Sequence, residues 1–323
     1  MNSADKERDK KKKFISSFYD EAFTRQESPQ QNISTERYEI LAVVDEGASK
    51  KVLKVEDSLT RRVLAMATLK DASPQNLELF EREARLTASL QHPHILPVYD
   101  IGNHETYGPY FTTKLIQGMS LRHLLKNLNK GNGQLSSVKQ RLEIFIKICD
   151  AISYAHSRGV LHLDIKPENI HISDYGEVLV LDWGLAKIQD SLVTDEFIDS
   201  YSFDSVEQKY TTLYGTVKGT PGYLAPEQCT KNGVKSKLTD IYSLGALLYE
   251  LITLKPLLVG DTQTLIAKTS RGDLDINSTL LTPGLEAVVL QAVAFSDDQR
   301  YQQVSALSND IQTYLEGFSP RAE

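Results

Sequence analysis

The segment VLHLDIKPENIHISDYGEVLVLDWGLA contains the residue types that transfer of a phosphoryl group to a hydroxyl requires. In this interpretation Asp164 accepts the proton of the attacking hydroxyl, and Lys166 neutralises charge on the moving phosphoryl group. Asn169 and Asp182 supply oxygen ligands to a divalent metal, and Gly184 lets the backbone bend beside Asp182. Each residue alone is common in turns, but the combination in this order predicts a phosphotransferase.

Short β-rich runs precede this segment in the chain. Runs of β-branched and aromatic residues, separated by turn-forming Asp, Glu, Gly and Ser, predict antiparallel strands at 37–47, 50–57, 61–69, 95–104 and 108–116. Between the third and the fourth of them, SPQNLELFEREARLTASLQHP predicts a helix with Ser73 as its N-cap and Pro74 at its first position. His92 and Pro93 are expected to end this helix.

The second part of the chain has a helical pattern. Apolar residues at three- and four-residue spacing predict helices at 121–129, 136–159, 240–254, 282–295 and 303–317. Near the N-terminus, Phe14, Phe18 and Ala22 could form one apolar helical face, and a disordered leader is an equal alternative. Because β-rich residues precede helical ones, the sequence predicts a two-lobed α+β protein.

Composition and charge are those of a soluble globular chain. A chain of 323 residues with 41% hydrophobic content and a net charge of −7 can bury a sizeable core. Cys149 and Cys229 lack metal or disulfide spacing, which indicates a reducing compartment. No apolar run has membrane-spanning length, so we expect a cytoplasmic chain without a membrane segment. Acidic residues surround the lysine run 10–13, which favours a solvated tail over a contact with nucleic acid or an acidic membrane surface.

Over about residues 38 to 316, the motifs resemble those of the eukaryotic-like protein kinases. HLDIKPEN is similar to the catalytic loop of that family, DWG to its metal-binding triplet, GTPGYLAPE to the end of its activation segment, and DIYSLG to its buried core helix. The catalytic-loop lysine together with Thr220 follows the serine/threonine pattern, and YLAPEQ and DWGLAK resemble bacterial members most. The resemblance implies an N-terminal extension at 1–34, lobes at 35–116 and 117–318, and a tail at 319–323.

The resemblance also implies ATP and Mg²⁺ or Mn²⁺ as cofactors and a protein as the substrate. It places Thr113 as the gatekeeper residue and residues 114–116 as the hinge that contacts adenine. The residues expected to bind ATP are Gly47, Val52, Ala65, Thr113, Lys114, Leu115 and Ile116.

Further roles follow from the same match. Glu83 occupies the helix position that normally forms a salt bridge with the phosphate-holding lysine, and Asp240 is expected to hydrogen-bond the backbone of the catalytic loop. Glu227 is expected to pair with Arg300. The resemblance assigns Thr220, Tyr223 and Glu227 to the substrate platform, and His162, Trp183, Gly184, Asp240 and Arg300 to structural roles.

The nucleotide-binding part departs from the family pattern. Ala67 stands where the family has its phosphate-holding lysine, and the three glycine positions of the family's loop hold Asp45, Gly47 and Lys50. The glycines normally let backbone N–H groups approach the phosphates, so the loop is expected to be stiffer. Asp45 adds negative charge beside a polyanion.

Three lysines are candidates for the missing group. Strand side chains alternate between faces, so Lys70 points away from the face that Ala67 shares. Lys50 lies on the loop side of Val52 and could reach both the phosphates and Glu83. Lys54, on the adenine side, is the weaker alternative. The arrangement resembles the with-no-lysine kinases, in which the third glycine position supplies the lysine.

Two functions remain open at this point. The first is an active protein serine/threonine kinase that uses Lys50, and the second is a pseudokinase scaffold that acts through protein contacts. Intact Asp164 and Asp182 favour the enzyme, whereas Ala67 and Asp45 favour the scaffold. A small-molecule phosphotransferase is disfavoured by GTPGYLAPE, which builds a platform for peptides.

Regulation by phosphate is expected to differ from that of many kinases. Leu163 replaces the arginine that usually binds a phosphate on the activation loop. The long segment between about 188 and 218 is nevertheless rich in hydroxyls, and autophosphorylation in trans is expected there. Its candidate acceptors are Thr194, Ser200, Ser202, Ser205, Thr211, Thr212 and Thr216.

Overall fold

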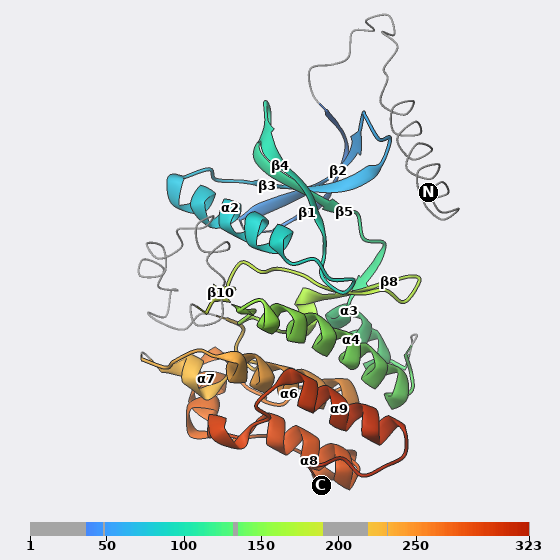
Figure 1. The fold of residues 1–323 in the computed structure, drawn as a ribbon, viewed down its shortest axis with the longest axis vertical. Helices are drawn as coiled ribbons and strands as arrows, with labels where there is room; N and C mark the ends of the chain where they lie inside the picture. Colours follow the sequence, from blue (N-terminus) through green and yellow to red (C-terminus); the bar gives the residue numbers. More distant parts are fainter. Residues whose placement is uncertain (1–36, 48, 132–134, 190–218, 231, 323) are drawn as a thin grey trace, which may run out of the picture.

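A five-stranded antiparallel sheet and one helix form the N-terminal part of the fold (Figure 1). The computed structural model describes residues 37–47, 49–131, 135–189, 219–230 and 232–322. The strands are β1 (Tyr38–Glu46), β2 (Lys50–Asp57), β3 (Val63–Leu69), β4 (Val98–His104) and β5 (Gly108–Lys114), in the spatial order β1-β2-β3-β5-β4. The predicted extension at 1–34 and the predicted phosphorylation sites between 194 and 216 lie outside the described residues.

The two faces of the sheet have different coverings. On one face, Leu53, Val55, Leu64 and Met66 are buried in an apolar cluster with Tyr38. The opposite face packs against α2 (Pro74–Ser89), where Ala67 and Phe111 of the strands contact Phe80 and Ala84 of the helix. Alternation along the strands therefore separates core residues from those that face α2 and the C-terminal lobe.

Helix α2 begins where the sequence predicts and ends earlier. Pro74 occupies the first turn after Ser73, although the Ser73 side chain makes no capping hydrogen bond. The helix ends at Ser89 rather than at His92 and Pro93, because Leu90 is extended and its side chain is buried in the core of the second lobe.

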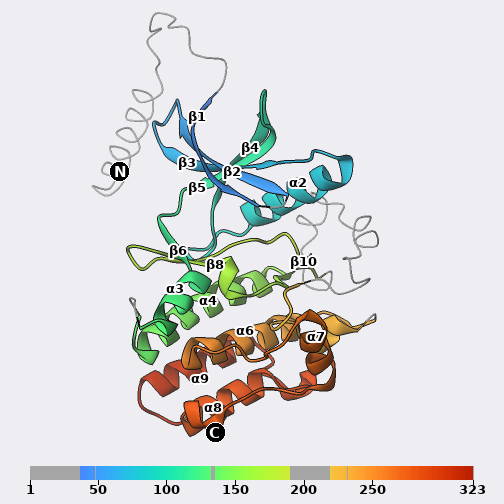
Figure 2. The same cartoon turned by 180° about the vertical axis from the view of Figure 1, so that it is seen from behind.

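Helices make up most of the C-terminal lobe (Figure 2). They are α3 (Leu121–Asn129), α4 (Val138–Ser157), α6 (Lys237–Thr253), α7 (Thr262–Arg271), α8 (Pro283–Ala292) and α9 (Val304–Leu315). Short strands lie toward the first lobe: β6 (Gly118–Ser120), β7 (Val160–Leu161), β8 (Ile170–Ser173), β9 (Val178–Val180) and β10 (Lys187–Ile188). Helix α6 is buried from Thr239 to Ile252 and packs against α4 and α8, so it forms the centre of this lobe.

One helix of the C-terminal lobe differs from the sequence-based expectation. Helix α7 was not predicted, because a single residue of it, Thr269, is fully buried and its apolar pattern is short. In the tail that begins at 319, Pro320 is buried, and the amides of Arg321 and Ala322 donate to the Asp310 carboxylate at 3.1 Å each. Among the described helices, none is both long and apolar enough to cross a membrane.

Candidate active site

The loop that contains Asp164 is held by a buried carboxylate from α6. The Asp240 oxygens accept hydrogen bonds from the amides of His162 and Leu163 at 2.8 Å each, and from Nε2 of His156 at 2.8 Å. Burial acts to raise the pKa of Asp240, but these hydrogen bonds and the nearby histidines hold it below its ordinary value. Asp240 therefore fixes the loop as an ionised group, which agrees with the expected contact.

The carboxylate of Asp164 lies at the centre of a hydrogen-bonded group. Its Oδ2 is 2.6 Å from Nζ of Lys166, and its Oδ1 accepts the hydroxyl of Thr220 at 2.9 Å. The Asn169 amide donates to Oδ2 at 3.1 Å and to the Asp164 carbonyl at 2.9 Å. Lys166 also donates to the Thr220 hydroxyl at 2.7 Å. The carboxylate is thus positioned to accept a hydrogen bond from a hydroxyl with an ammonium beside it.

Leu163 has a left-handed backbone with φ 64°, which is unfavourable for a leucine. Its carbonyl accepts a hydrogen bond from Nε2 of Gln228 at 3.2 Å, and Oε1 of Gln228 accepts the Ala225 amide at 2.9 Å. Gln228 is buried. Sequence analysis did not single out Gln228, and its adjacency to Glu227 in YLAPEQ is the available signal.

The DWG triplet lies against the ring of His162 and the carboxylate of Glu83. Trp183 is buried, and its ring lies 4.5 Å from that of His162, which contacts the Leu181 carbonyl through Nε2 at 3.2 Å. A Cβ on Gly184 would lie 3.1 Å from both Oδ1 of Asp182 and Oε2 of Glu83. A side chain at this position would therefore be tight against both carboxylates, which would have to shift by a few tenths of an ångström to admit it.

Lys50 and Glu83 form an ion pair between β2 and α2. In the sheet register Lys50 is opposite Leu69, and Val52 is opposite Ala67. Burial raises the pKa of Glu83, the positive charge of Lys50 acts to lower it, and the charge of Asp182 raises it further. The contact that was predicted for Lys50 is present.

Lys70 is engaged elsewhere. Its ammonium lies 2.9 Å from the carboxylate of Glu46, the last residue of β1. This pair agrees with the prediction that Lys70 faces away from Ala67.

The residues expected to bind ATP lie on adjacent strands and at the end of β5. Ala65 is opposite Thr113 in the β3–β5 register, and Leu115 and Ile116 follow β5 directly. The ammonium of Lys114 forms an ion pair with Glu177 of the β8–β9 turn, at 2.8 and 2.6 Å from its two oxygens. Because the Lys114 side chain is bound to the second lobe, the groups of Lys114 left to contact a nucleotide are its backbone N–H and carbonyl.

The available groups fit a magnesium nucleotide. A Cβ on Gly47 would meet the Lys50 carbonyl at 3.6 Å, an ordinary contact, so the fold itself does not require glycine at this position. Its absent side chain leaves room for close approach by a phosphate. Asp182 and Asn169 offer the oxygen donors that Mg²⁺ prefers. Among the described residues, no group of three or more His, Cys, Asp or Glu forms a separate metal site.

The platform residues are connected to the core of the second lobe. Nη1 and Nη2 of Arg300, whose side chain is fully buried, donate to the Glu227 carboxylate at 2.9 and 3.0 Å. Thr239 donates to the same carboxylate at 2.8 Å. The Tyr223 hydroxyl donates to Glu250 of α6. The expected Glu227–Arg300 pair is therefore present.

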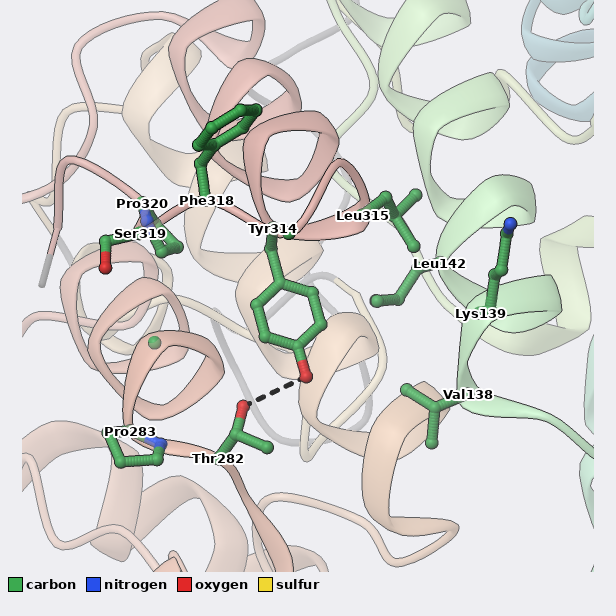
Figure 3. Close-up of a pocket in the computed structure, with 12 residues that line it drawn as sticks. Val138, Lys139, Leu142, Thr282, Pro283, Tyr314, Leu315, Phe318, Ser319 and Pro320 are labelled. Carbon is green, nitrogen blue, oxygen red and sulfur yellow. Dashed lines mark hydrogen bonds between the residues drawn. The ribbon is translucent and has the colours of Figure 1, made fainter.

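A pocket of about 600 Å³ lies among the ends of α4, α8 and α9 (Figure 3). Its lining includes Val138, Leu142, Thr282, Tyr314, Leu315 and Phe318. The hydroxyl of Thr282 donates to that of Tyr314 at 3.2 Å. None of the predicted site residues belongs to this pocket, so it is separate from the candidate active site.

Comparison with known proteins agrees with this arrangement. Residues 38–312 match the family model described as protein kinase domain. The chain is 36% identical over 303 residues to a serine/threonine-protein kinase PknD of Protochlamydia amoebophila, covering 89% of this chain and 31% of that protein. It is 34% identical over 310 residues to the PknD of Chlamydia muridarum, covering 88% and 32% respectively.

The chain thus spans about a third of the length of the curated relatives that it matches. The fold that the sequence predicted, a small antiparallel sheet with one helix and a larger helical lobe, is confirmed. The chain belongs to the protein kinase family.

Proposed function

We propose that this chain is a protein serine/threonine kinase in which Lys50 replaces the strand lysine that is absent at Ala67. The ion pair between Lys50 and Glu83 carries the lysine assignment. Similarity to two PknD proteins, both named serine/threonine-protein kinases, supports the reaction class. The lysine of the catalytic loop beside Thr220 supports serine or threonine as the acceptor.

The proposed reaction divides the work among residues of both lobes. Bound Mg²⁺-ATP supplies the γ-phosphoryl group and the metal charge that screens the phosphates. Asp164 accepts the proton of the substrate hydroxyl, as it accepts the Thr220 hydroxyl at 2.9 Å in this structure. Lys166 neutralises negative charge near that hydroxyl. Asn169 and Asp182 would hold the metal.

Lys50 has a positioning and charge-neutralising role in this proposal. Its contact with Glu83 directs the ammonium toward the DWG segment, because Oε2 of Glu83 also approaches Gly184. A lysine ammonium on a flexible stem can bind a phosphate and a carboxylate together. Gly47 and Val52 lie on the same hairpin and would cover the nucleotide.

The test is transfer of labelled γ-phosphate from ATP to the chain and to a generic peptide substrate, with Mg²⁺ or Mn²⁺. We expect Lys50→Ala to lose about 100-fold or more in kcat/KM, because a charge contact in the transition state is removed. Asp164→Asn is expected to lose about 1,000-fold through loss of the general base. Lys70→Ala is the matched control, since Lys70 pairs with the exposed Glu46.

Each outcome separates the candidate functions. Loss of transfer in Lys54→Ala or Lys70→Ala, with Lys50→Ala active, would retain the kinase and reject the lysine assignment. Equal transfer by the wild type and Asp164→Asn would instead support a pseudokinase scaffold.

Two finer properties stay predictions. They are autophosphorylation in trans and a cytoplasmic location. Since the matched PknD proteins are about three times as long as this chain, the activity of a whole protein also belongs to the proposal.

A further inference from the structure

Asp45 lies near the end of β1, directly after an irregularity in the pairing of β1 with β2. The register of the two strands shifts between Val43 and Asp45. Val43 is opposite Leu53 and Asp45 is opposite Val52, so Val44 is an extra residue on β1. Such a β-bulge bends its strand and changes the direction of the side chains that follow, and bulges are frequent beside active sites.

The bulge turns Asp45 toward the face of the sheet that is expected to bind ATP. Cross-strand partners point to the same side of a sheet. Val43 therefore shares the side of Leu53, which is buried in the apolar cluster on the other face, whereas Asp45 shares the side of Val52 and Ala67. In a regular strand, residues two positions apart share a side, so the bulge is what separates Asp45 from Val43.

The next residue, Glu46, has the opposite orientation. It is opposite Lys51, and its carboxylate lies 2.9 Å from the ammonium of Lys70, which faces away from Ala67. Successive residues of a strand point to opposite sides. The ion pair of Glu46 is therefore independent support for an Asp45 side chain on the nucleotide side.

The position of Asp45 along the hairpin indicates which part of ATP it meets. On the same face of β2, Val52 is expected to cover the adenine, and Lys50, two positions nearer the loop, is expected to meet the phosphates. On β1, Asp45 is level with Val52, and Gly47, on the phosphate side, is two positions further along. The ribose joins the adenine to the phosphates, so it is the part of ATP that Asp45 is placed to contact.

A carboxylate suits a ribose better than it suits a phosphate. Phosphates are anions and repel it, whereas the ribose hydroxyls at 2′ and 3′ are neutral hydrogen-bond donors, which carboxylates bind in other nucleotide-binding folds. Oδ1 of Asp45 accepts the amide of Glu46 at 2.8 Å. An ionised carboxylate has about four acceptor sites, so this bond leaves acceptor sites for two hydroxyls.

We propose that Asp45 is a specificity-determining residue that accepts hydrogen bonds from the ribose hydroxyls of the nucleotide. The substrate class is then ribonucleoside triphosphates rather than their deoxy counterparts. This inference rests on the proposed kinase function, which supplies ATP as the ligand. Asp45 has no assigned part in phosphoryl transfer, so its effect is expected in nucleotide affinity.

Isothermal titration calorimetry of the full chain with Mg²⁺ would compare ATP, 2′-deoxy-ATP and 3′-deoxy-ATP. We expect the wild type to bind ATP about tenfold more tightly than at least one deoxy analogue, because a hydrogen bond to a charged group is lost. In Asp45→Ala this ratio should fall to within about twofold. In Asp45→Asn the amide oxygen still accepts a hydrogen bond, so an intermediate ratio of about threefold is expected.

Glu46→Ala is the matched control, because it removes the adjacent carboxylate from the opposite face and should leave the ratio unchanged. Asp45 is exposed, so its substitutions should leave the thermal unfolding midpoint unchanged. If Asp45→Ala strengthens the binding of ATP and of both analogues by the same factor, Asp45 merely repels the phosphates and the proposal is overturned. Equal binding of the three nucleotides by the wild type overturns it as well.

Transfer of labelled γ-phosphate separates this inference from the proposed function. An Asp45-dependent preference for ATP, in a wild type that transfers no phosphate, would reject the kinase function and retain the ribose contact. Phosphate transfer with equal affinity for ATP and both deoxy analogues would retain the kinase and reject the role of Asp45. A wild type that binds none of the three nucleotides would overturn both.

Discussion

The Lys50 ammonium binds the Glu83 carboxylate from a position on β2, whereas the family places the corresponding lysine on β3. Cross-strand partners point to the same side of a sheet, so Lys50, Val52, Ala67 and Leu69 share one face. Successive residues of a strand are about 3.3 Å apart along its axis. The four-carbon side chain of a lysine is long enough to carry its ammonium past two such positions. The short side chain at Ala67 leaves this path open.

This relationship predicts that the lysine can be moved back to β3. Lys50→Ala should reduce kcat/KM for ATP by about 100-fold. The double variant Lys50→Ala with Ala67→Lys should have a kcat/KM about tenfold higher than that of Lys50→Ala. Its new lysine is on β3, the neighbouring strand, and shares the face from which Lys50 reaches the Glu83 carboxylate. Recovery should be incomplete, since Ala67 packs against Phe80 and Ala84 and a lysine stem would crowd them.

Steady-state kinetics at varied ATP would measure both effects. Ala67→Lys alone serves as a control for crowding, and it should be less active than the wild type because two ammonium groups compete for Glu83. If the double variant is no more active than Lys50→Ala, the position of the ammonium at β2 is essential and the two lysine positions are not equivalent.

Gln228 is expected to support the catalytic loop. Gln228→Leu removes the hydrogen bond to the carbonyl of Leu163, a residue with a strained backbone, and leaves a buried acceptor without that partner. A buried acceptor left without a hydrogen bond typically lowers the stability of the fold by about 1–3 kcal/mol. We expect kcat to fall about tenfold while the Kd for ATP is unchanged, because Gln228 contacts the loop and not the nucleotide-binding strands.

Single-turnover transfer and equilibrium nucleotide binding would separate these effects. Gln312→Leu is the matched control, because its amide contacts Glu316 on the exposed surface of α9. A Gln228→Leu variant with weaker ATP binding and normal transfer would contradict the assigned role.

Local patterns in the sequence suffice for much of the fold. The bounds of β2 and α3 agree with the predicted 50–57 and 121–129, because turn residues flank a clear alternation in one case and a clear apolar spacing in the other. The face that Lys50 shares with Val52 follows from the two-residue period alone. Its contact with Glu83 was therefore predictable once the helix position of Glu83 was identified.

Contacts between segments that are distant in the sequence could not be predicted from local sequence patterns. Gln228 and Leu163 are 65 positions apart, and Arg122 and Glu250 are 128 apart. Neither pair has a spacing signal, since each depends on how α3, α6 and the loops pack. Helix α7 had local signals that went unused: Asp261 caps its start, and Gly272, with φ 73°, ends it.

The buried pair of Glu227 and Arg300 is expected to matter for stability. Glu227→Ala would leave the fully buried guanidinium of Arg300 without its carboxylate, which typically costs about 3–5 kcal/mol. Guanidinium chloride unfolding would measure the loss. Arg271→Ala is the control, because the Arg271–Asp273 pair is exposed and should change the unfolding free energy by less than about 1 kcal/mol. If Glu227→Ala and Arg271→Ala lost equal unfolding free energy, burial would not determine how much an ion pair contributes to stability.

Asp57, at the end of β2, is expected to make the stability of the first lobe depend on pH in the acid range. A hydrogen bond from Arg37 lowers the pKa of its carboxyl to about 2, while burial acts in the opposite direction. Because the folded-state pKa lies below the ordinary value of 3.8, the ionised carboxylate stabilises the fold above about pH 4. That contribution is lost progressively as the pH falls from 4 toward 2.

Urea unfolding of the wild type and Asp57→Asn between pH 6 and pH 3 would measure this contribution. The difference in unfolding free energy should be constant from pH 6 to about pH 5 and should shrink below pH 4. Its total change is limited to about 2 kcal/mol, and solvent around the 44%-exposed Arg37 reduces it further. Parallel pH profiles for the two proteins down to pH 3 would mean that Asp57 is not ionised preferentially in the folded state.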